Sequence, residues 1–188
     1  MMKAIPYVLL LPLVLIVLFV QCEKEPEPVN IPDDAFLNAL IEEGVDTDGD
    51  GQISHSEAEA VRSLDVSGYN ISDMTGIEKF VSLDILLCSV NQLTSLDVSN
   101  ITALSFLDCS FNRLTSLDVS YIPSLKYLAC VANQLTKLNV SNNTALEFLY
   151  CSSIDCAPND NEQGNKYNRI YCKFFSYTLH VIFEGNCS

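Results

Sequence analysis

The segment LLCSVNQLTSLDVSN (residues 86–100) returns almost unchanged as LDCSFNRLTSLDVSY (residues 107–121). A third copy, LACVANQLTKLNVSN, occupies residues 128–142. The chain therefore divides into frames of equal length that begin at Leu83, Leu104 and Leu125, after a slightly longer, divergent first frame from Val61. A fourth copy starts as LEFLYCSS at Leu146, after which the pattern stops.

A period of 20–29 residues with leucine spaced as in these frames is typical of leucine-rich repeats. Each frame is expected to supply one short strand, a turn and a return segment, and to have an apolar side that it cannot bury alone. Stacking of neighbouring frames buries that side in a continuous core. The sequence therefore predicts an α/β solenoid: a short leucine-rich-repeat stack over residues 61–153, with a helical EF-hand-like cap before it.

One cysteine and one asparagine recur together in the three full frames, and the cysteine recurs again in the fourth. Cysteines at this regular interval occupy one inward position on successive strands, where cysteine acts as a small apolar side chain; they are Cys88, Cys109, Cys130 and Cys151. Disulfides and a metal site are the alternatives, although side chains that project in parallel suit either poorly. Asn91, Asn112 and Asn133 are expected to satisfy backbone groups at the turn that leaves each strand.

The segment DTDGDGQISHSE (residues 46–57) fits the EF-hand calcium loop at every required position. Gly51 permits the turn in the middle of the loop, and Ile53 is the apolar residue expected to pack inward. The predicted Ca²⁺ ligands are Asp46, Asp48, Asp50, Gln52 through its carbonyl, Ser54 through a water, and Glu57. The alternative is a solvated acidic turn.

Helices are predicted on both sides of this loop. Residues 32–45 form a short amphipathic helix that Asp33 or Asp34 caps, and SEAEAVRSL (residues 56–64) begins the second helix. The sequence contains no second loop of this kind, which favours a structural role with a Kd for calcium on the order of 10⁻⁴–10⁻³ M.

The N-terminal residues predict export. Lys3 precedes an uncharged apolar stretch, residues 4–20, and Cys22 follows it. Residues 1–22 resemble a bacterial lipoprotein signal, which implies lipidation of Cys22 and a location on the bacterial outer membrane or cell surface. An ordinary secretory signal and an uncleaved membrane anchor are the alternatives. The acidic, proline-containing residues 23–30 form an extended linker.

The charge excludes several classes of partner. The formal net charge is −14, all 24 carboxylates follow residue 22, and no cluster of Lys or Arg exists. These facts argue against binding to nucleic acid or electrostatic docking on anionic lipid. Catalysis has little support either, because the two histidines, His55 and His180, lie in the calcium loop and the tail, and no catalytic motif is present. The prediction is a non-enzymatic protein.

The frames resemble internalin-type leucine-rich repeats, in particular the cysteine-bearing variety of bacterial surface proteins. The resemblance implies adhesion to an extracellular protein or glycan through the concave face of the strands. The residues predicted to line that face are Ile85, Phe106, Asp108, Tyr127, Phe148 and Tyr150. Aromatic side chains supply large contact areas. Two alternatives remain: strands simply favour aromatics, or the tail covers them.

Residues 154–188 depart from the repeat. Cys156, Cys172 and Cys187 lie in this segment, where partial pairing with one another or with Cys151 is one possibility. The segment is interpreted either as a cap over the end of the stack or as the result of truncation within a repeat. The calcium cap is assigned to residues 31–60. A structural or accessory lipoprotein and a truncated remnant of a larger adhesin are the alternative functions.

Overall fold

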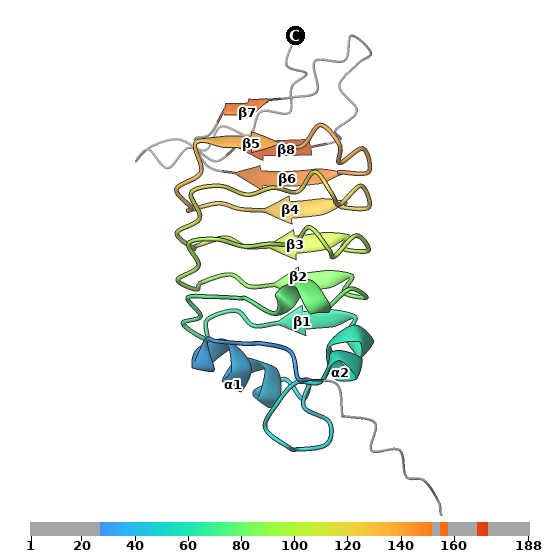
Figure 1. The fold of residues 1–188 in the computed structure, drawn as a ribbon. Coiled ribbons are helices and arrows are strands. Elements are labelled where there is room, and N and C mark those ends of the chain that lie inside the picture. The colour runs from blue at the N-terminus through green and yellow to red at the C-terminus, as the bar shows by residue number, and fades with distance from the viewer. Residues whose placement is uncertain (1–26, 152–154, 158–168, 173–188) are drawn as a thin grey trace, which may run out of the picture.

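The computed structural model describes residues 27–151, 155–157 and 169–172. It is a stack of parallel strands with helices α1 (Asp34–Glu42) and α2 (His55–Ala60) at its N-terminal end (Figure 1). A 3₁₀ helix, η1 (Ile77–Lys79), lies in the first frame. The strands are β1 Ser63–Asp65, β2 Ile85–Leu87, β3 Phe106–Asp108, β4 Tyr127–Ala129, β5 Lys137–Asn139, β6 Phe148–Cys151, β7 Asp155–Ala157 and β8 Arg169–Cys172.

The register of the strands confirms the predicted frames. Ser63 pairs with Ile85, and Ile85 pairs with Phe106, so each residue lies beside the one at the same position of the next frame. The main sheet is parallel throughout, with the order β1-β2-β3-β4-β6-β8, and β5 pairs with β7 in a second, two-stranded sheet. The main sheet therefore continues through β8, beyond the residue at which the sequence repeat stops.

The core lies inside the stack and repeats with the same period. Leu64, Leu86, Leu107, Leu128 and Leu149 sit at the centres of their strands and are buried. Cys88, Cys109, Cys130 and Cys151 are buried and form no disulfide, as the packing interpretation predicts. For these four cysteines the disulfide alternative is therefore wrong. Burial raises the pKa of the Cys88 and Cys109 thiols well above the usual range, so both are protonated at neutral pH.

The asparagine ladder is also confirmed. The Asn112 Nδ2 donates to the carbonyls of Cys88 and Cys109, at 3.0 Å each, and its Oδ1 accepts from the Leu93 N–H at 3.0 Å. Asn91 and Asn133 make the equivalent bonds one frame before and one frame after. Each asparagine thus ties its own frame to the preceding one at a turn where no sheet partner is present.

Asp33 joins the N-terminal helix to the first frame. Its Oδ1 caps α1 by accepting from the N–H groups of Ala35 and Phe36, at 2.8 and 3.2 Å. Its Oδ2 accepts from the N–H and hydroxyl of Ser72 and from the N–H of Asp73, at 2.7–2.9 Å. Burial alone raises the pKa of Asp33, but these hydrogen bonds outweigh it and lower the pKa to about 2.

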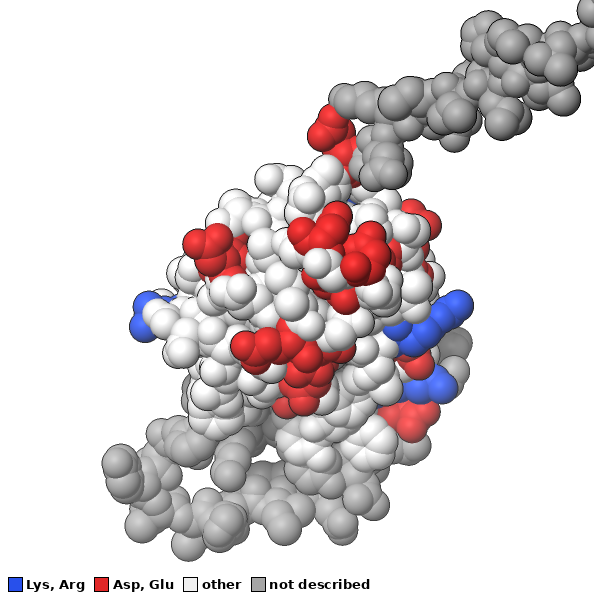
Figure 2. Space-filling view, turned by 90° about the horizontal axis from the view of Figure 1, so that it is seen from below, with Lys and Arg blue, Asp and Glu red and all other residues white. Residues whose placement is uncertain are grey.

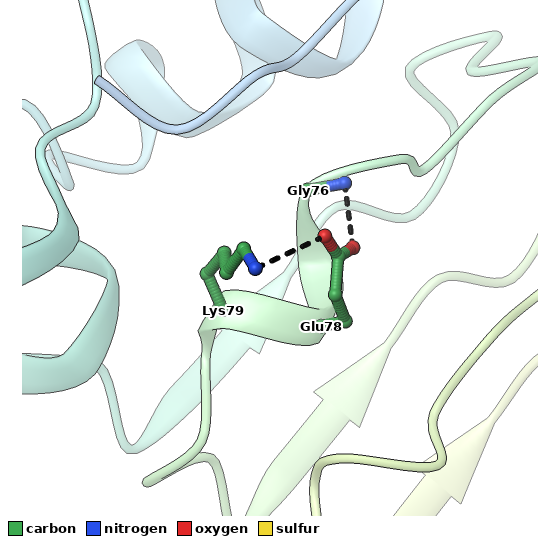
Figure 3. Close-up of polar contacts among 3 residues, drawn as sticks. All are labelled: Gly76, Glu78 and Lys79. Carbon is green, nitrogen blue, oxygen red and sulfur yellow. Dashed lines mark hydrogen bonds and ion pairs between the residues drawn. The ribbon is translucent and has the colours of Figure 1, made fainter. Parts of the chain in front are cut away.

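Gly76 lets the N-terminal segment pack closely against the first frame. Its φ is +104°, and a Cβ at this position would lie 2.9 Å from the Asn30 carbonyl oxygen and 2.9 Å from a side-chain carbon of Ile31. The Gly76 N–H donates to Glu78, whose other oxygen lies 3.8 Å from the Lys79 ammonium (Figure 3). Only glycine combines this backbone conformation with this approach.

The second helix differs from the prediction in its bounds. It begins at His55 and ends at Ala60, because Val61 is extended and the chain enters β1 at Ser63. Leu64, which the sequence pattern assigns to the helix, therefore belongs to β1. No helix in the described part of the chain has the length and apolar character that a membrane crossing requires.

Candidate binding face and metal loop

Three carboxylates converge in the loop between α1 and α2. Asp46, Asp48 and Asp50 each place one oxygen so that the three lie within 4.8 Å of one another. Backbone N–H groups point at these carboxylates: Gly49 and Gly51 donate to Asp46 at 2.7 and 3.0 Å. Gly49 and Gly51 have φ of +77° and +81°, a conformation that favours glycine. Oxygen ligands of this kind suit a hard cation such as Ca²⁺.

Glu57 and Ser54, the last two predicted ligands, contact each other in a capping box that starts α2. The Ser54 Oγ accepts from the Glu57 N–H at 3.2 Å, and the Ser54 N–H donates to the Glu57 Oε2 at 2.9 Å. The Glu57 Oε1 accepts from the Thr47 N–H at 2.6 Å and from its hydroxyl at 2.8 Å. These bonds from Ser54 and Thr47 lower the pKa of Glu57 to about 2, so it is a carboxylate at neutral pH.

The centre of the loop is attached to the segment that enters the fold. Ile53 is buried, as predicted, and its carbonyl accepts from the Val29 N–H at 2.8 Å. Val29 is buried too and lies against Gly76 of the first frame. The loop, the N-terminal segment and the first frame are therefore in one packed unit.

The N-terminal end of the stack is strongly acidic. Residues 27–61 contain no Lys or Arg. A view onto this end shows acidic side chains spread across it, with basic side chains at its margins (Figure 2). Such a field attracts cations and repels polyanions.

Aromatic rings form a cluster on the outer face of the main sheet. The rings of Phe106 and Tyr127, at paired positions of β3 and β4, are stacked with centroids 4.0 Å apart and an interplanar angle of 4°. The ring centroid of Tyr127 lies 5.4 Å from that of Tyr150 and 6.3 Å from that of Phe148, and both of these rings are tilted relative to Tyr127. All four residues are half-buried, so neighbouring rings shield part of the surface that the sequence alone suggested would be exposed.

The other predicted face residues join this cluster in part. Ile85 and Asp108 are also half-buried, and the Asp108 carboxylate accepts from the Ser110 N–H at 2.9 Å. Burial raises the pKa of Tyr127, helped by the neighbouring Tyr150 and Asp108, so its hydroxyl remains a hydrogen-bond donor. Cys22, the predicted lipidation site, lies outside the described residues.

A backbone conformation that sequence reasoning missed borders this face, at positions that the repeat pattern also assigns to the concave side. Val90, Phe111 and Ala132 have φ of 56°, 55° and 54°, in the left-handed region. Val90 and Phe111 are 59% and 52% exposed. The signal available in the sequence was Gly68, which corresponds to Val90 of the next frame just as Ser63 corresponds to Ile85.

Comparison with known proteins identifies the type of repeat. No protein-family model matches the chain. Internalin J of Listeria monocytogenes serotype 4b (strain F2365) is 37% identical over 71 residues, which is 38% of this chain and 8% of that protein. Over these 71 residues the repeats of this chain are similar to an internalin, and the stack of parallel strands is of the leucine-rich-repeat type.

A solved internalin structure agrees with the fold. An internalin (InlF) from L. monocytogenes str. 4b F2365 matches 68% of this chain and 46% of its own, with a TM-score of 0.52 and 23% identity. The functional domain of InlJ from Listeria monocytogenes, described as including a cysteine ladder, matches 54% of this chain and 27% of its own, with a TM-score of 0.43 and 39% identity. The internalin-like chain thus spans less than half the length of each of these relatives.

Proposed function

We propose that this internalin-like chain is a non-enzymatic binding module of a bacterial cell surface, which recognises an extracellular protein or glycan through the outer face of its main sheet. The aromatic cluster of Phe106, Tyr127, Phe148 and Tyr150 supports this proposal best. A rigid parallel sheet holds these rings at fixed positions, so that little side-chain entropy is lost when they contact a partner.

The chemistry of the described residues supports binding over catalysis. The thiols of Cys88 and Cys109 are buried and protonated, and are therefore poor nucleophiles. The one histidine within the described residues, His55, lies at the start of α2 beside the acidic loop. Hydroxyl groups among these residues, such as those of Thr47 and Ser72, contact carboxylates that cap or join elements of the fold, and none is hydrogen-bonded to His55.

Simultaneous substitution of Phe106, Tyr127 and Phe148 by serine tests the proposed face. The assay is binding to a random peptide-display library and to a glycan array. A binding module loses its selected peptide or glycan in the triple variant while it still unfolds in one cooperative transition. An accessory lipoprotein without a ligand, or a remnant of a larger adhesin, would select nothing above background in the wild-type chain either.

Calcium is the second part of the proposal. Asp46, Asp48 and Asp50 would hold the ion, with the Gln52 carbonyl as a further ligand. Four hydrogen bonds from Thr47 and Ser54 fill the acceptor capacity of Glu57, so binding through Glu57 requires at least one of these donors to turn away. The bound cation would neutralise charge at the acidic end and thereby brace the N-terminal cap.

Thermal unfolding with calcium and with chelator tests this role. With a Kd on the order of 10⁻⁴–10⁻³ M, about 10 mM calcium adds about 1.4–2.7 kcal/mol and raises Tm by about 5 °C. Asp46→Asn abolishes most of the rise, because the first position of the loop pattern admits only aspartate and the amide has one acceptor oxygen where the carboxylate has two. Asp97→Asn is the matched control: Asp97 likewise accepts from a backbone N–H group, that of Ser99, in a distant frame. Equal calcium shifts in both variants would contradict the metal site.

The proposed location rests on residues 1–22, which precede the described part. We propose that Cys22 carries lipid and tethers the module to the bacterial outer membrane or cell surface; secretion or an N-terminal membrane anchor is the alternative. Metabolic labelling with a fatty-acid probe tests this directly. The label should be lost in Cys22→Ser, and a label that persists would contradict lipidation of this residue.

A further inference from the structure

We infer that Val90 and Phe111 form a contact ridge at the edge of the binding face, and that this ridge receives apolar side chains of a protein partner that are bordered by Lys or Arg. This inference rests on the proposed function, because the ridge extends the same face. It adds residues to that face and commits to one class of partner.

The ridge residues occupy one backbone position of successive frames. The N–H groups of Gly68, Val90 and Phe111 donate to the carbonyls of Ser89, Ser110 and Val131, at 3.0, 3.0 and 2.8 Å. Each bond connects a frame to the next, shortly after the end of the strand. The φ angle is left-handed at every one of these positions, +79° at Gly68 and 54–56° at Val90, Phe111 and Ala132.

This backbone conformation favours glycine, which the first frame has. A left-handed φ is unusual for any other L residue and is an outlier for a β-branched one such as Val90. A Cβ on Gly68 would meet no atom within 4 Å, so a side chain at this position points away from the frame. More than half of the surface of Val90 and of Phe111 is indeed exposed.

Neither conformation nor core packing therefore explains why the chain places Val90 and Phe111 here. Both residues disfavour the backbone, and both expose apolar surface to water, which also costs free energy. A contact with another molecule accounts for both observations, since it buries this surface and uses the rigid projection of the side chains.

The chemistry of the face favours a protein over a glycan. Sugar rings bind aromatic side chains through open ring faces, together with many hydrogen-bonding groups. Here Phe106 and Tyr127 each cover one face of the other's ring, and Asp108 already accepts a bond from Ser110. Apolar side chains of a protein need only the ring edges and the ridge.

The charge of the face favours a basic partner. In strands β1–β4 and β6, and at the residue before each, acidic side chains outnumber basic ones; the acids are Asp65, Asp84, Asp108 and Glu147, and the bases are Arg62 and Lys126. With a net charge of −14, a second copy of this chain is repelled, whereas Lys and Arg around an apolar cluster are attracted.

The experiment is a selection from a random peptide-display library on the full chain, followed by titration of the strongest labelled peptide by fluorescence anisotropy. The selected peptides should be rich in apolar residues and in Lys or Arg. Val90→Gly/Phe111→Gly should bind the peptide at least about tenfold more weakly, with an unchanged or higher Tm because glycine suits the backbone. Phe111→Asn, which also tolerates this conformation, should weaken binding in the same direction.

Tyr121→Ser is the matched control, because Tyr121 is 60% exposed but lies in the return segment of its frame and not directly after a strand. Its affinity should equal that of the wild type. If the serine triple variant loses the peptide but the glycine variant binds as the wild type does, the proposed face stands and the ridge is refuted. Selection of acidic peptides, or of glycans alone, would overturn the partner class. No selection above background would overturn both proposals.

Discussion

Two buried asparagines, Asn112 and Asn143, should respond to substitution with opposite signs. Both side chains donate from Nδ2 to backbone carbonyls inside the stack. Only Asn112 also uses its carbonyl oxygen, whereas the Asn143 Oδ1 has no hydrogen-bond partner among the described residues. The effect of removing each amide therefore depends on which backbone groups lose their partner.

Asn112→Ala should destabilise the protein by about 3 kcal/mol. The carbonyls of Cys88 and Cys109 retain bonds from Asn91 and Asn133, so they remain satisfied. The buried Leu93 N–H loses its acceptor, and an unsatisfied buried donor costs about 1–3 kcal/mol by itself. The lost Nδ2 bonds account for the remainder.

Asn143→Ile should leave stability unchanged or increase it by up to about 2 kcal/mol. The carbonyls of Val119 and Ile122 also accept from the N–H groups of Ile122 and Leu125, so they retain a partner. The substitution removes a buried oxygen without a partner and adds apolar surface. Ile101 and Ile122 occupy the equivalent position of the two preceding frames.

Urea unfolding followed by circular dichroism measures both changes, provided that each variant shows one transition with the slope of the wild type. Asn133→Ala is a graded comparison, because Asn133 makes the same kind of bonds but is partly exposed, and its cost should be smaller than that of Asn112→Ala. A cost for Asn112→Ala below about 1 kcal/mol would refute the ladder argument. If Asn143→Ile destabilises the protein as much as Asn112→Ala does, the argument that the Val119 and Ile122 carbonyls retain a hydrogen-bond partner is refuted.

Two further predictions concern ionisable groups. Hydrogen bonds lower the pKa of Asp33 from 3.8 to about 2 in the folded protein, so the unfolded chain takes up this proton at a higher pH. Asp33 therefore contributes about 1–2 kcal/mol to the free energy of unfolding, after allowance for its partial exposure. This contribution should be lost as pH falls from about 4 to about 2. Asp33→Asn should lack this component in acid titrations of stability, and an unchanged titration would contradict the assignment. Cys88 and Cys109 should resist iodoacetamide in the native protein and react in urea, as peptide mass spectrometry can show; native labelling would contradict their burial.

The repeat architecture could be predicted from the sequence because single residues, such as the cysteines and asparagines, recur at a regular spacing. The lengths of the first two frames predicted the strand register from Ser63 through Ile85 to Phe106. The positions of Cys88 and Asn91 predicted which side chains face inward, and the asparagine bonds follow from the same spacing. These predictions depend on period alone, which is independent of the details of packing.

The missed features depend on local conformation and on choices between partners. Val90 and Phe111 have a left-handed φ, but Val and Phe are not residue types that predict this conformation. The geometry of the frame imposes it against the preference of these side chains. The ligand pattern of the loop assigns both Ser54 and Glu57 to a cation, but the same two residues also satisfy the capping-box pattern of α2. Sequence alone does not decide which of these uses the protein makes of them.

The contacts of the N-terminal segment connect the loop with the repeats. Ile53 binds Val29 at the centre of the loop, Val29 lies against Gly76, and Asp33 holds α1 to Ser72 and Asp73. A leucine-rich stack has apolar surface at its first frame, and these contacts cover it with polar groups turned outward. A cation bound by Asp46, Asp48 and Asp50 would therefore stabilise more than its own loop, because loosening the loop also frees Val29 and exposes the apolar end of the stack.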